Sequence, residues 1–315
     1  MYKVFVDGQE GTTGLQIRER LAKQTGIEVL EIPTEKRKDT EVRRELLNQS
    51  DISFLCLPDA AARESASLVT DKHTRLIDAS TAHRTDPDWT YGLPELNKNQ
   101  RSRIRDASRV ANPGCHATGF NLLMFPLVTD GIVPSDYPVT CHSVTGYSGG
   151  GKKLIAMYET TERSTEHLAA PRHYGLTLTH KHLPEMQKIS GLDSPPLFTP
   201  ILGAIYKGMG VFVPLHRRLL CKQLTAAEMC EHLAAYYAEE AFVEVYPYDP
   251  AARADNGFFN PMAANDTNKN DIFVFGHDDQ ILLVSRLDNL GKGASGAAVQ
   301  NMNIMLGMDE GIGLR

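Results

Sequence analysis

The N-terminal segment constrains the fold more than any other part of the chain. Residues 2–7 form an apolar run typical of a buried strand, and this run leads into three evenly spaced glycines and then a helical pattern. A strand, a glycine turn and a helix in this order open a parallel α/β sheet, in which glycines let the backbone approach a pyrophosphate at the helix N-terminus. The spacing is G-x-x-G-x-x-G rather than the commoner G-x-G-x-x-G, and a plain tight turn is the alternative. We expect Gly8, Gly11 and Gly14 to hold a dinucleotide.

The segment up to residue 114 continues the α/β pattern. Further strands are expected at residues 27–32, 52–57, 75–78 and 109–111, with helical patterns between them. Ligands bind at the carboxyl ends of such parallel strands. Segments distant in sequence follow these strand ends and should converge on one crevice: the glycine loop, Pro58-Asp59, Ser80 and Cys115.

The character of the sequence changes after Cys115. Strands of a mixed sheet are expected at residues 138–146, 211–215, 242–246 and 281–285. Residues 226–241 predict a helix with a capping box made by Thr225 and Glu228. The tail, residues 289–306, should return to the first domain and close the cofactor crevice. The sequence predicts a Rossmann domain of residues 1–114 plus 287–315 and a second α+β domain of residues 115–286.

Composition argues against several kinds of partner. The net charge of −6 and the pI of about 6.0 give no support for a nucleic-acid or anionic membrane surface. No run approaches the ~18 apolar residues of a membrane span, and the first strand leaves no room for a signal peptide. The five cysteines show neither a C-x-x-C pair nor metal spacing. We therefore expect reduced thiols and a cytoplasmic protein.

The motif Asn112-Pro113-Gly114-Cys115 places a thiol after a tight turn and at the start of an expected helix. Unpaired N–H groups and the positive end of the helix dipole lower the pKa of such a thiol and favour the thiolate, which attacks carbonyl carbon. The alternative is a small buried filler. Its position at a strand end, beside the expected crevice, favours the nucleophile.

Two histidines, His180 and His182, stand two residues apart. In a strand they would share one face, which could hold a metal, but no third ligand follows at zinc spacing. One of them as a general base beside the cysteine is more economical, because an imidazole titrates near neutral pH. A surface pair without a chemical role is the third interpretation.

Two further segments could hold an anion. Arg84, after the strand at residues 75–78, would offer a planar fork to a phosphate or carboxylate, although an ordinary surface arginine fits equally well. The loop at residues 146–153 could be a linker or a backbone nest for an anion. It lacks the G-K-[ST] ending of a P-loop, so we reject a nucleoside triphosphatase.

The sequence contains signals for both nicotinamide cofactors. Glu31 lies near the end of the second strand, where an acidic residue would bind the ribose of NAD. Thr34, Lys36, Arg37 and Lys38 follow directly and suit the 2′-phosphate of NADP, although such a cluster is often only a solvated face. We expect NADP(H).

Together these motifs resemble the N-acetyl-γ-glutamyl-phosphate reductase family in its shorter form. The resemblance runs from end to end and also covers Tyr91-Gly92-Leu93-Pro94-Glu95-Leu96 and residues 288–301. It implies a glyceraldehyde-3-phosphate-dehydrogenase-like second domain, NADPH as the cofactor, and a homo-oligomer, either a dimer or a tetramer. It also implies a small acyl phosphate substrate and inorganic phosphate as a product.

The resemblance implies roles for individual residues. Cys115 would be the nucleophile, and His182 is favoured over His180 as the acid/base. Further cofactor contacts are implied at Thr12, Thr13, Ser80, Gln300 and Asn301, and substrate contacts at Arg84, Ser148 and Glu185. The chain departs from the family at Gly149 to Gly151, and at His116, where many members have tyrosine. Either ring can flank the thiolate.

The implied reaction is reduction of the acyl phosphate to a semialdehyde through a cysteine thioester, in arginine biosynthesis. A reductase of another acyl phosphate, such as aspartyl phosphate or a lysine-pathway analogue, would need the same motifs. A nucleotide sensor without catalysis is the alternative from another class, and the thiol, the histidine pair and the arginine together argue against it.

Overall fold

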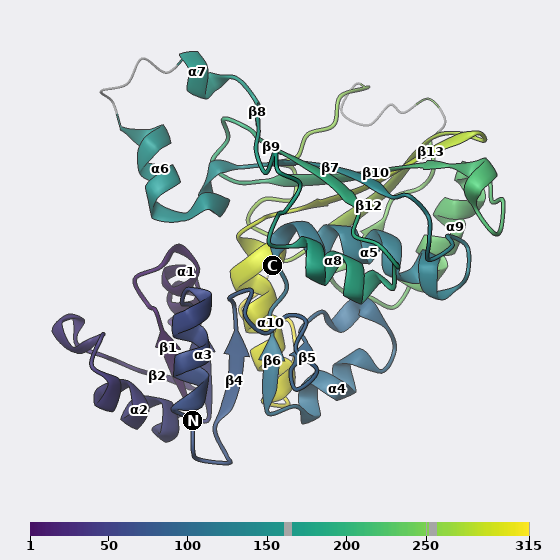
Figure 1. The fold of residues 1–315 in the computed structure, drawn as a ribbon. Helices are drawn as coiled ribbons and strands as arrows, with labels where there is room; N and C mark the ends of the chain where they lie inside the picture. The colour runs from purple at the N-terminus through teal and green to yellow at the C-terminus, as the bar shows by residue number, and fades with distance from the viewer. Residues whose placement is uncertain (161–165, 250, 252–256, 315) are drawn as a thin grey trace. The chain divides into compact units, whose positions relative to one another are not determined.

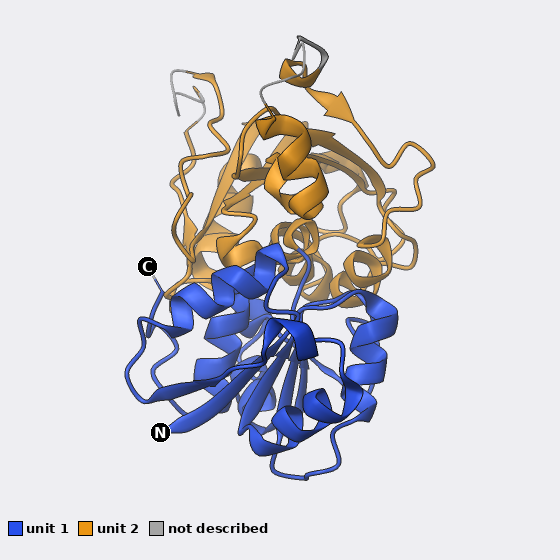
Figure 2. Ribbon diagram, turned by 90° about the vertical axis from the view of Figure 1, so that its left-hand side faces the viewer, with its two compact units in different colours: residues 1–114, 294–315 blue, residues 115–293 orange. Residues whose placement is uncertain are grey.

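The computed structural model describes residues 1–160, 166–249, 251 and 257–314. The chain forms two compact units, Met1–Gly114 with Ala294–Arg315, and Cys115–Gly293 (Figure 2). Residues 294–315 belong to the first unit. The boundary expected from the sequence is 287, the last residue of strand β13 (Gln280–Leu287), which belongs to the second unit.

The first unit is a six-stranded parallel sheet in the order β2-β1-β3-β4-β6-β5. Its strands are β1 (Tyr2–Asp7), β2 (Ile27–Leu30), β3 (Ile52–Leu55), β4 (Arg75–Asp78), β5 (Thr90–Tyr91) and β6 (Arg109–Ala111). Its α-helices are α1 (Thr12–Leu21), α2 (Thr40–Gln49), α3 (Asp59–Ser67), α4 (Gln100–Asp106) and α10 (Gly296–Met305). This is the Rossmann arrangement expected from the alternating pattern.

Both faces of this sheet are covered, which explains the continuous apolar runs of its strands. Val4 and Val6 of β1 point to the side packed by α1, α4 and α10, whereas Phe5 points to the side packed by α2 and α3. Each of these side chains is essentially inaccessible to solvent, and burying one stabilises the fold by about 1.5–3 kcal/mol.

The glycine loop needs glycine at its first and third positions. Gly8 has φ +92°, and a Cβ there would lie 2.3 Å from the carbonyl oxygen of Cys56. A Cβ on Gly14 would lie 2.4 Å from the carbonyl oxygen of Gly8. At Gly11, the N-cap of α1, the nearest atom would be at an ordinary 3.4 Å. The loop therefore packs tightly against the residues that follow β3, while Thr12 and Thr13 at the start of α1 are partly exposed.

The second unit is a seven-stranded mixed sheet in the order β11-β12-β13-β10-β7-β9-β8. Besides β13, its strands are β7 (Thr140–Thr145), β8 (Arg172–His173), β9 (Leu197–Leu202), β10 (Met209–His216), β11 (Val243–Val245) and β12 (Asn270–His277). Its α-helices are α5 (Cys115–Thr129), α6 (Gly151–Glu159), α7 (Glu166–Ala169), α8 (Leu183–Ser190) and α9 (Ala226–Tyr236). Helices α5 and α8 lie side by side against the sheet (Figure 1).

The helix predicted at residues 226–241 begins where expected and ends earlier, at Tyr236. Thr225 and Glu228 form the expected capping box. Among the described residues, no helix is long and apolar enough to cross a membrane.

Candidate active site

The chain is fixed immediately before the cysteine by Asn112. Its backbone N–H donates to Asp78 (2.8 Å), and its backbone carbonyl accepts from Arg84 Nε (3.0 Å). Its side-chain amide donates to the carbonyl of Ala294 (3.0 Å) and accepts from Asn301 Nδ2 (3.1 Å). These hydrogen bonds, all within the first unit, hold the end of β6 rigidly. The asparagine of the Asn-Pro-Gly-Cys motif is therefore a structural anchor.

Cys115 is the first residue of α5, as the sequence predicted, and its side chain is half-buried. Its thiol therefore stands at a helix N-terminus, where backbone N–H groups lack intrahelical partners. A turn of π-helix, Gly291–Ser295, passes directly against it. A Cβ on Gly293 would lie 2.7 Å from the Cβ of Cys115, so only glycine allows this approach.

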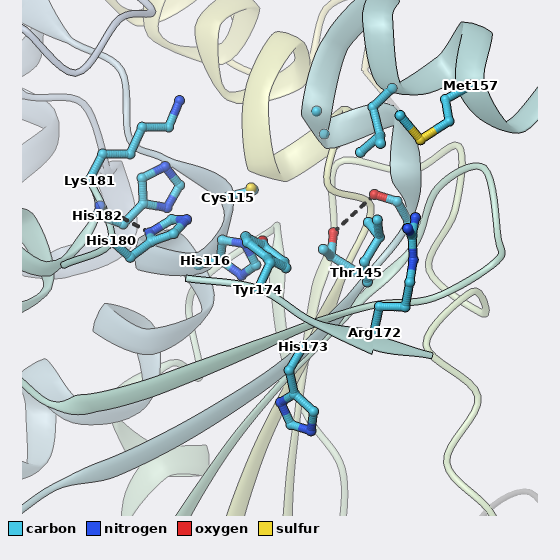
Figure 3. A pocket seen from close by; sticks show the side chains of 15 residues that line it. Cys115, His116, Thr145, Met157, Arg172, His173, Tyr174, His180, Lys181 and His182 are labelled. Carbon is cyan, nitrogen blue, oxygen red and sulfur yellow. Dashed lines mark hydrogen bonds between the residues drawn. The ribbon is translucent and has the colours of Figure 1, made fainter. Parts of the chain in front are cut away.

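A cavity of about 540 Å³ opens in front of Cys115, and all of its lining residues belong to the second unit (Figure 3). Two cations, Lys181 and Arg172, line it, together with four imidazoles, those of His116, His173, His180 and His182. Its apolar wall consists of Leu154, Met157 and Leu202, and its backbone wall includes Gly149 and Gly150. In Figure 3 the sulfur of Cys115 lies between the pair His180 and His182 on one side and Arg172 on the other.

The interpretation of His180 and His182 as strand neighbours is wrong. They lie in a turn, and His182 is the N-cap of α8. Their ring centroids are 4.8 Å apart with the planes nearly perpendicular, and the backbone N–H of His182 donates to Nδ1 of His180 (3.2 Å). His182 is buried and His180 is half-buried. No group of three or more ligands suited to a metal occurs in the described part of the chain.

His116 is buried at the cavity wall next to Cys115 and makes a hydrogen bond with each ring nitrogen. Nδ1 is 2.8 Å from Oγ of Ser143, and Nε2 is 2.8 Å from the hydroxyl of Tyr174. Its ring also packs 5.4 Å from the rings of both His180 and His182. Burial, followed by the nearby His180 and Lys181, lowers the pKa of His116 to about 3, so the ring is neutral.

Arg172, on β8, lines the cavity, and no sequence motif marks it. One terminal nitrogen donates to the hydroxyl of Tyr158 (2.7 Å), and the guanidinium lies 5.4 Å from the centre of that ring. Its Nε is buried and has no hydrogen-bond partner among the described residues. No carboxylate of the described residues pairs with it. Arg172 therefore presents an unused donor and a positive charge at a cavity wall.

Comparison with known proteins places these features in a family. Residues 3–104 match the NAD binding domain of semialdehyde dehydrogenases, and residues 115–289 match their dimerisation domain. The chain is 48% identical to "N-acetyl-gamma-glutamyl-phosphate reductase 2" of Nostoc sp. over 99% of both chains. It is also 48% identical to the N-acetyl-gamma-glutamyl-phosphate reductase of Sinorhizobium medicae, over 96% of this chain and 98% of that protein.

The chain belongs to the N-acetyl-γ-glutamyl-phosphate reductase family. Its fold is also that of aspartate semialdehyde dehydrogenases. The enzyme from Francisella tularensis superimposes with a TM-score of 0.73 at 16% identity, covering 97% of this chain and 100% of that one. The second form from Vibrio cholerae gives a TM-score of 0.70 at 17% identity, covering 97% and 98%. The expected fold class, a Rossmann domain with a second α+β domain, is confirmed, and the second domain matches the dimerisation domain of semialdehyde dehydrogenases.

Several residues expected at the substrate or cofactor of a family member are buried in this structure. Ser148 and Glu185 are buried and do not line the cavity, and Oγ of Ser148 accepts from Asn289 (3.1 Å). Arg84 is buried and holds the carbonyls of Asn112 and Ala79. Of these three side chains, Arg84 supports the backbone directly before Cys115.

Three polar residues of the first unit that were expected near the cofactor make hydrogen bonds within that unit. The hydroxyl of Ser80 donates to Asp78 (2.8 Å). Gln300 and Asn301 are fully buried on α10, where they donate to Glu95 (2.8 Å) and to the carbonyl of Gly92 (2.9 Å). These bonds connect α10 to the segment that precedes β6.

The first unit suits a dinucleotide, as its match to the NAD binding domain family indicates. The start of α1 is open beside Gly11, and Thr12 and Thr13 form its first turn with partly exposed side chains. Glu31 is paired with Arg18 of α1. Lys36 and Arg37 are exposed at the next turn and pair with no acid among the described residues.

Proposed function

We propose that this chain catalyses the NADPH-dependent reduction of N-acetyl-γ-glutamyl phosphate to N-acetylglutamate 5-semialdehyde and phosphate, in arginine biosynthesis. The observation that carries the proposal is the thiol of Cys115 at the start of α5, in a cavity that His180 and His182 also line. Identity of 48% along the whole chain with reductases of this name supports the substrate.

The thiolate of Cys115 attacks the acyl carbon, the bond from that carbon to the phosphate oxygen breaks, and a thioester forms as phosphate leaves. When bound, the nicotinamide supplies the hydride that reduces this thioester. Backbone N–H groups at the start of α5 steady the negative oxygen of each tetrahedral adduct. His182, with His180 beside it, accepts the hydroxyl proton of the thiohemiacetal as this adduct collapses to the aldehyde and Cys115 leaves as the thiolate.

The two negative ends of the substrate match the two cations of the cavity. Arg172 has a buried, unused Nε and is proposed to bind the α-carboxylate, with the acetyl group against Leu154 and Met157. Lys181 is proposed to meet the phosphate. Arg84 stays a proposed phosphate ligand, although its Nε and one terminal nitrogen already hold backbone carbonyls.

For the cofactor, NADPH is favoured over NADH. The carboxylate of Glu31 pairs with Arg18, which leaves it less suited to bind a ribose hydroxyl. Lys36 and Arg37, with Thr34 beside them, are exposed and able to meet a 2′-phosphate. The glycine loop and the first turn of α1 would cradle the pyrophosphate, and Ser80, Gln300 and Asn301 would act by shaping the backbone near the nicotinamide.

The match to a dimerisation domain supports a homo-oligomer, which we propose is a dimer or a tetramer. Because the mechanism needs Cys115 as a reduced thiol, the proposed compartment is the cytoplasm.

The test is phosphate-dependent reduction of NADP by N-acetylglutamate semialdehyde, the reverse reaction. We expect turnover that requires phosphate, and a rate with aspartate semialdehyde at least 100-fold lower. Preference for aspartate semialdehyde would assign the chain to a sister reaction. No turnover with either aldehyde, together with slow alkylation of Cys115 by iodoacetamide, would favour a nucleotide sensor.

A further inference from the structure

Two side chains beside Cys115 have no part in the mechanism above. His116 follows the nucleophile directly, and Tyr174 lines the same cavity. A hydrogen bond of 2.8 Å joins Nε2 of His116 to the hydroxyl of Tyr174, and another of 2.8 Å joins Nδ1 to Oγ of Ser143. These three side chains form a chain of hydrogen bonds that ends in the cavity, and the direction of each bond decides what Tyr174 offers a substrate.

The direction follows from the proton of Ser143. Its side chain is fully buried, and within the described part of the structure its hydroxyl has one partner, Nδ1 of His116. If Nδ1 carried the proton and donated to Ser143, the serine proton would be buried without an acceptor, which is strongly disfavoured. Ser143 therefore donates to Nδ1, and this nitrogen carries no proton.

A neutral imidazole with an unprotonated Nδ1 carries its proton on Nε2. Neutrality is supported by the burial of His116, which lowers its pKa to about 3. Nε2–H then donates to the oxygen of Tyr174, and the phenol keeps its own proton for another acceptor. The hydroxyl of Tyr174 has no other partner among the described residues, and its ring lines the cavity beside Cys115 (Figure 3).

We propose that His116 is a positioning residue that turns the O–H of Tyr174 toward the cavity, where Tyr174 donates a hydrogen bond to the negative oxygen of the adduct on Cys115. This inference rests on the proposed function. The phenol remains protonated during the reaction, because burial and the charge of the Cys115 thiolate raise the pKa of Tyr174. No proton leaves Tyr174, so the thiolate, the adduct and the histidine pair keep the proton balance given above.

The kinetic test uses Tyr174→Phe, His116→Phe and His116→Gln. Removing one donor to such an oxygen lowers kcat by about 10²–10³-fold in other enzymes. We expect a loss of about 100-fold in kcat for Tyr174→Phe, with KM changed less than threefold. His116→Phe should lose a similar factor, and the double variant should be no slower than Tyr174→Phe.

His116→Gln is the matched control, because its amide can accept from Ser143 and donate to Tyr174 at once. We expect it to keep kcat within about fivefold of the wild type. Equal losses in His116→Gln and His116→Phe would show a packing role and overturn the inference. Thermal melting of each variant identifies one that does not fold.

A direct readout is the tautomer of His116. In the wild-type protein, ¹⁵N NMR should show His116 neutral with the proton on Nε2 between about pH 6 and 8. The signal among the 11 histidines is assigned from its absence in His116→Gln. A proton on Nδ1, or unchanged kcat in Tyr174→Phe, overturns the inference while the wild type still reduces its substrate. Lack of wild-type turnover would instead refute the proposed function.

Discussion

Replacing Arg172 with methionine tests how the cavity selects its substrate. Methionine retains much of the side chain's apolar volume and removes the charge together with the buried, unused Nε donor. If Arg172 binds the α-carboxylate, the variant should bind the semialdehyde weakly while the chemistry at Cys115 continues. We therefore expect a higher KM for the aldehyde and a kcat within about fivefold of the wild type.

The size of the effect follows from the donors that remain. One terminal nitrogen of Arg172 is committed to Tyr158, so Nε and the other terminal nitrogen are left for a carboxylate. Each hydrogen bond to a charged group contributes about 1.5–3 kcal/mol. Because Arg172 is half-buried rather than sealed from water, we take the lower value for each, about 3 kcal/mol in total. Since ~1.4 kcal/mol is a factor of ten, KM should rise about 100-fold.

The assay is the reverse reaction with each substrate varied in turn. For Arg172→Met, KM for the aldehyde should rise and KM for phosphate should stay within twofold. Lys181→Met, which removes the other cation of the cavity, should show the opposite pattern. The aldehyde 4-acetamidobutanal, which lacks the carboxylate, should react equally with the wild type and Arg172→Met. A 100-fold loss with this analogue, or a rise in KM for phosphate, would refute carboxylate binding by Arg172.

Four other changes give independent checks. Cys115→Ser should lower kcat by at least about 10³-fold and leave the NADPH affinity measured by fluorescence unchanged; a near-normal rate would exclude the thioester. Replacing Lys36 and Arg37 by alanine should raise KM for NADPH about 10–100-fold and leave KM for NADH unchanged, whereas equal effects would contradict 2′-phosphate binding. Thr225→Ala should lower the free energy of unfolding in urea by about 1 kcal/mol, whereas Thr225→Ser should retain most of the stability that the cap contributes. Burial lowers the pKa of His116 from 6.5 to about 3, so its contribution to the free energy of unfolding is constant above pH 6.5 and falls in acid. The loss should be about 1.4 kcal/mol near pH 5.5. His116→Gln should remove this part of the acid sensitivity.

The first unit could be predicted closely because its signals are local. A buried strand that runs into a glycine turn leaves few alternatives, and β1, β4 and β6 have the predicted bounds. β2 and β3 end two residues earlier than predicted, since apolar residues continue past the last ladder hydrogen bond and remain in the core, as Ile32 does. β5 has only two residues and carries no periodicity that a pattern could detect.

The second unit was less predictable because its strands depend on distant partners. β9 contains Pro200, which weakens any strand pattern, and pairs with β7 across a long stretch of chain. β12 was missed although it pairs with β13 through a short turn. The spacing of His180 and His182 fitted a strand, but His182 caps α8, so the two rings meet through a turn instead.

The residues that line the cavity show where local patterns stop being informative. Cys115 and the histidine pair stand in motifs, so their chemistry could be read from residue types and spacing. Arg172 and Tyr174 lie in a segment without such a motif, and β8 brings them to the cavity through its pairing with β9. The resemblance to a family implies Ser148 and Glu185 instead, and both are buried and do not line the cavity.

His116 shows why even a correct family assignment leaves part of a site unexplained. By sequence alone it is interchangeable with tyrosine, because either ring can flank the thiolate. In the structure its two ring nitrogens reach Ser143 and Tyr174 on different elements, β7 and the segment after β8. A tyrosine has one polar atom and cannot accept from the first while donating to the second from opposite sides of its ring. The proposed orientation of Tyr174 therefore depends on a buried imidazole next to the nucleophile.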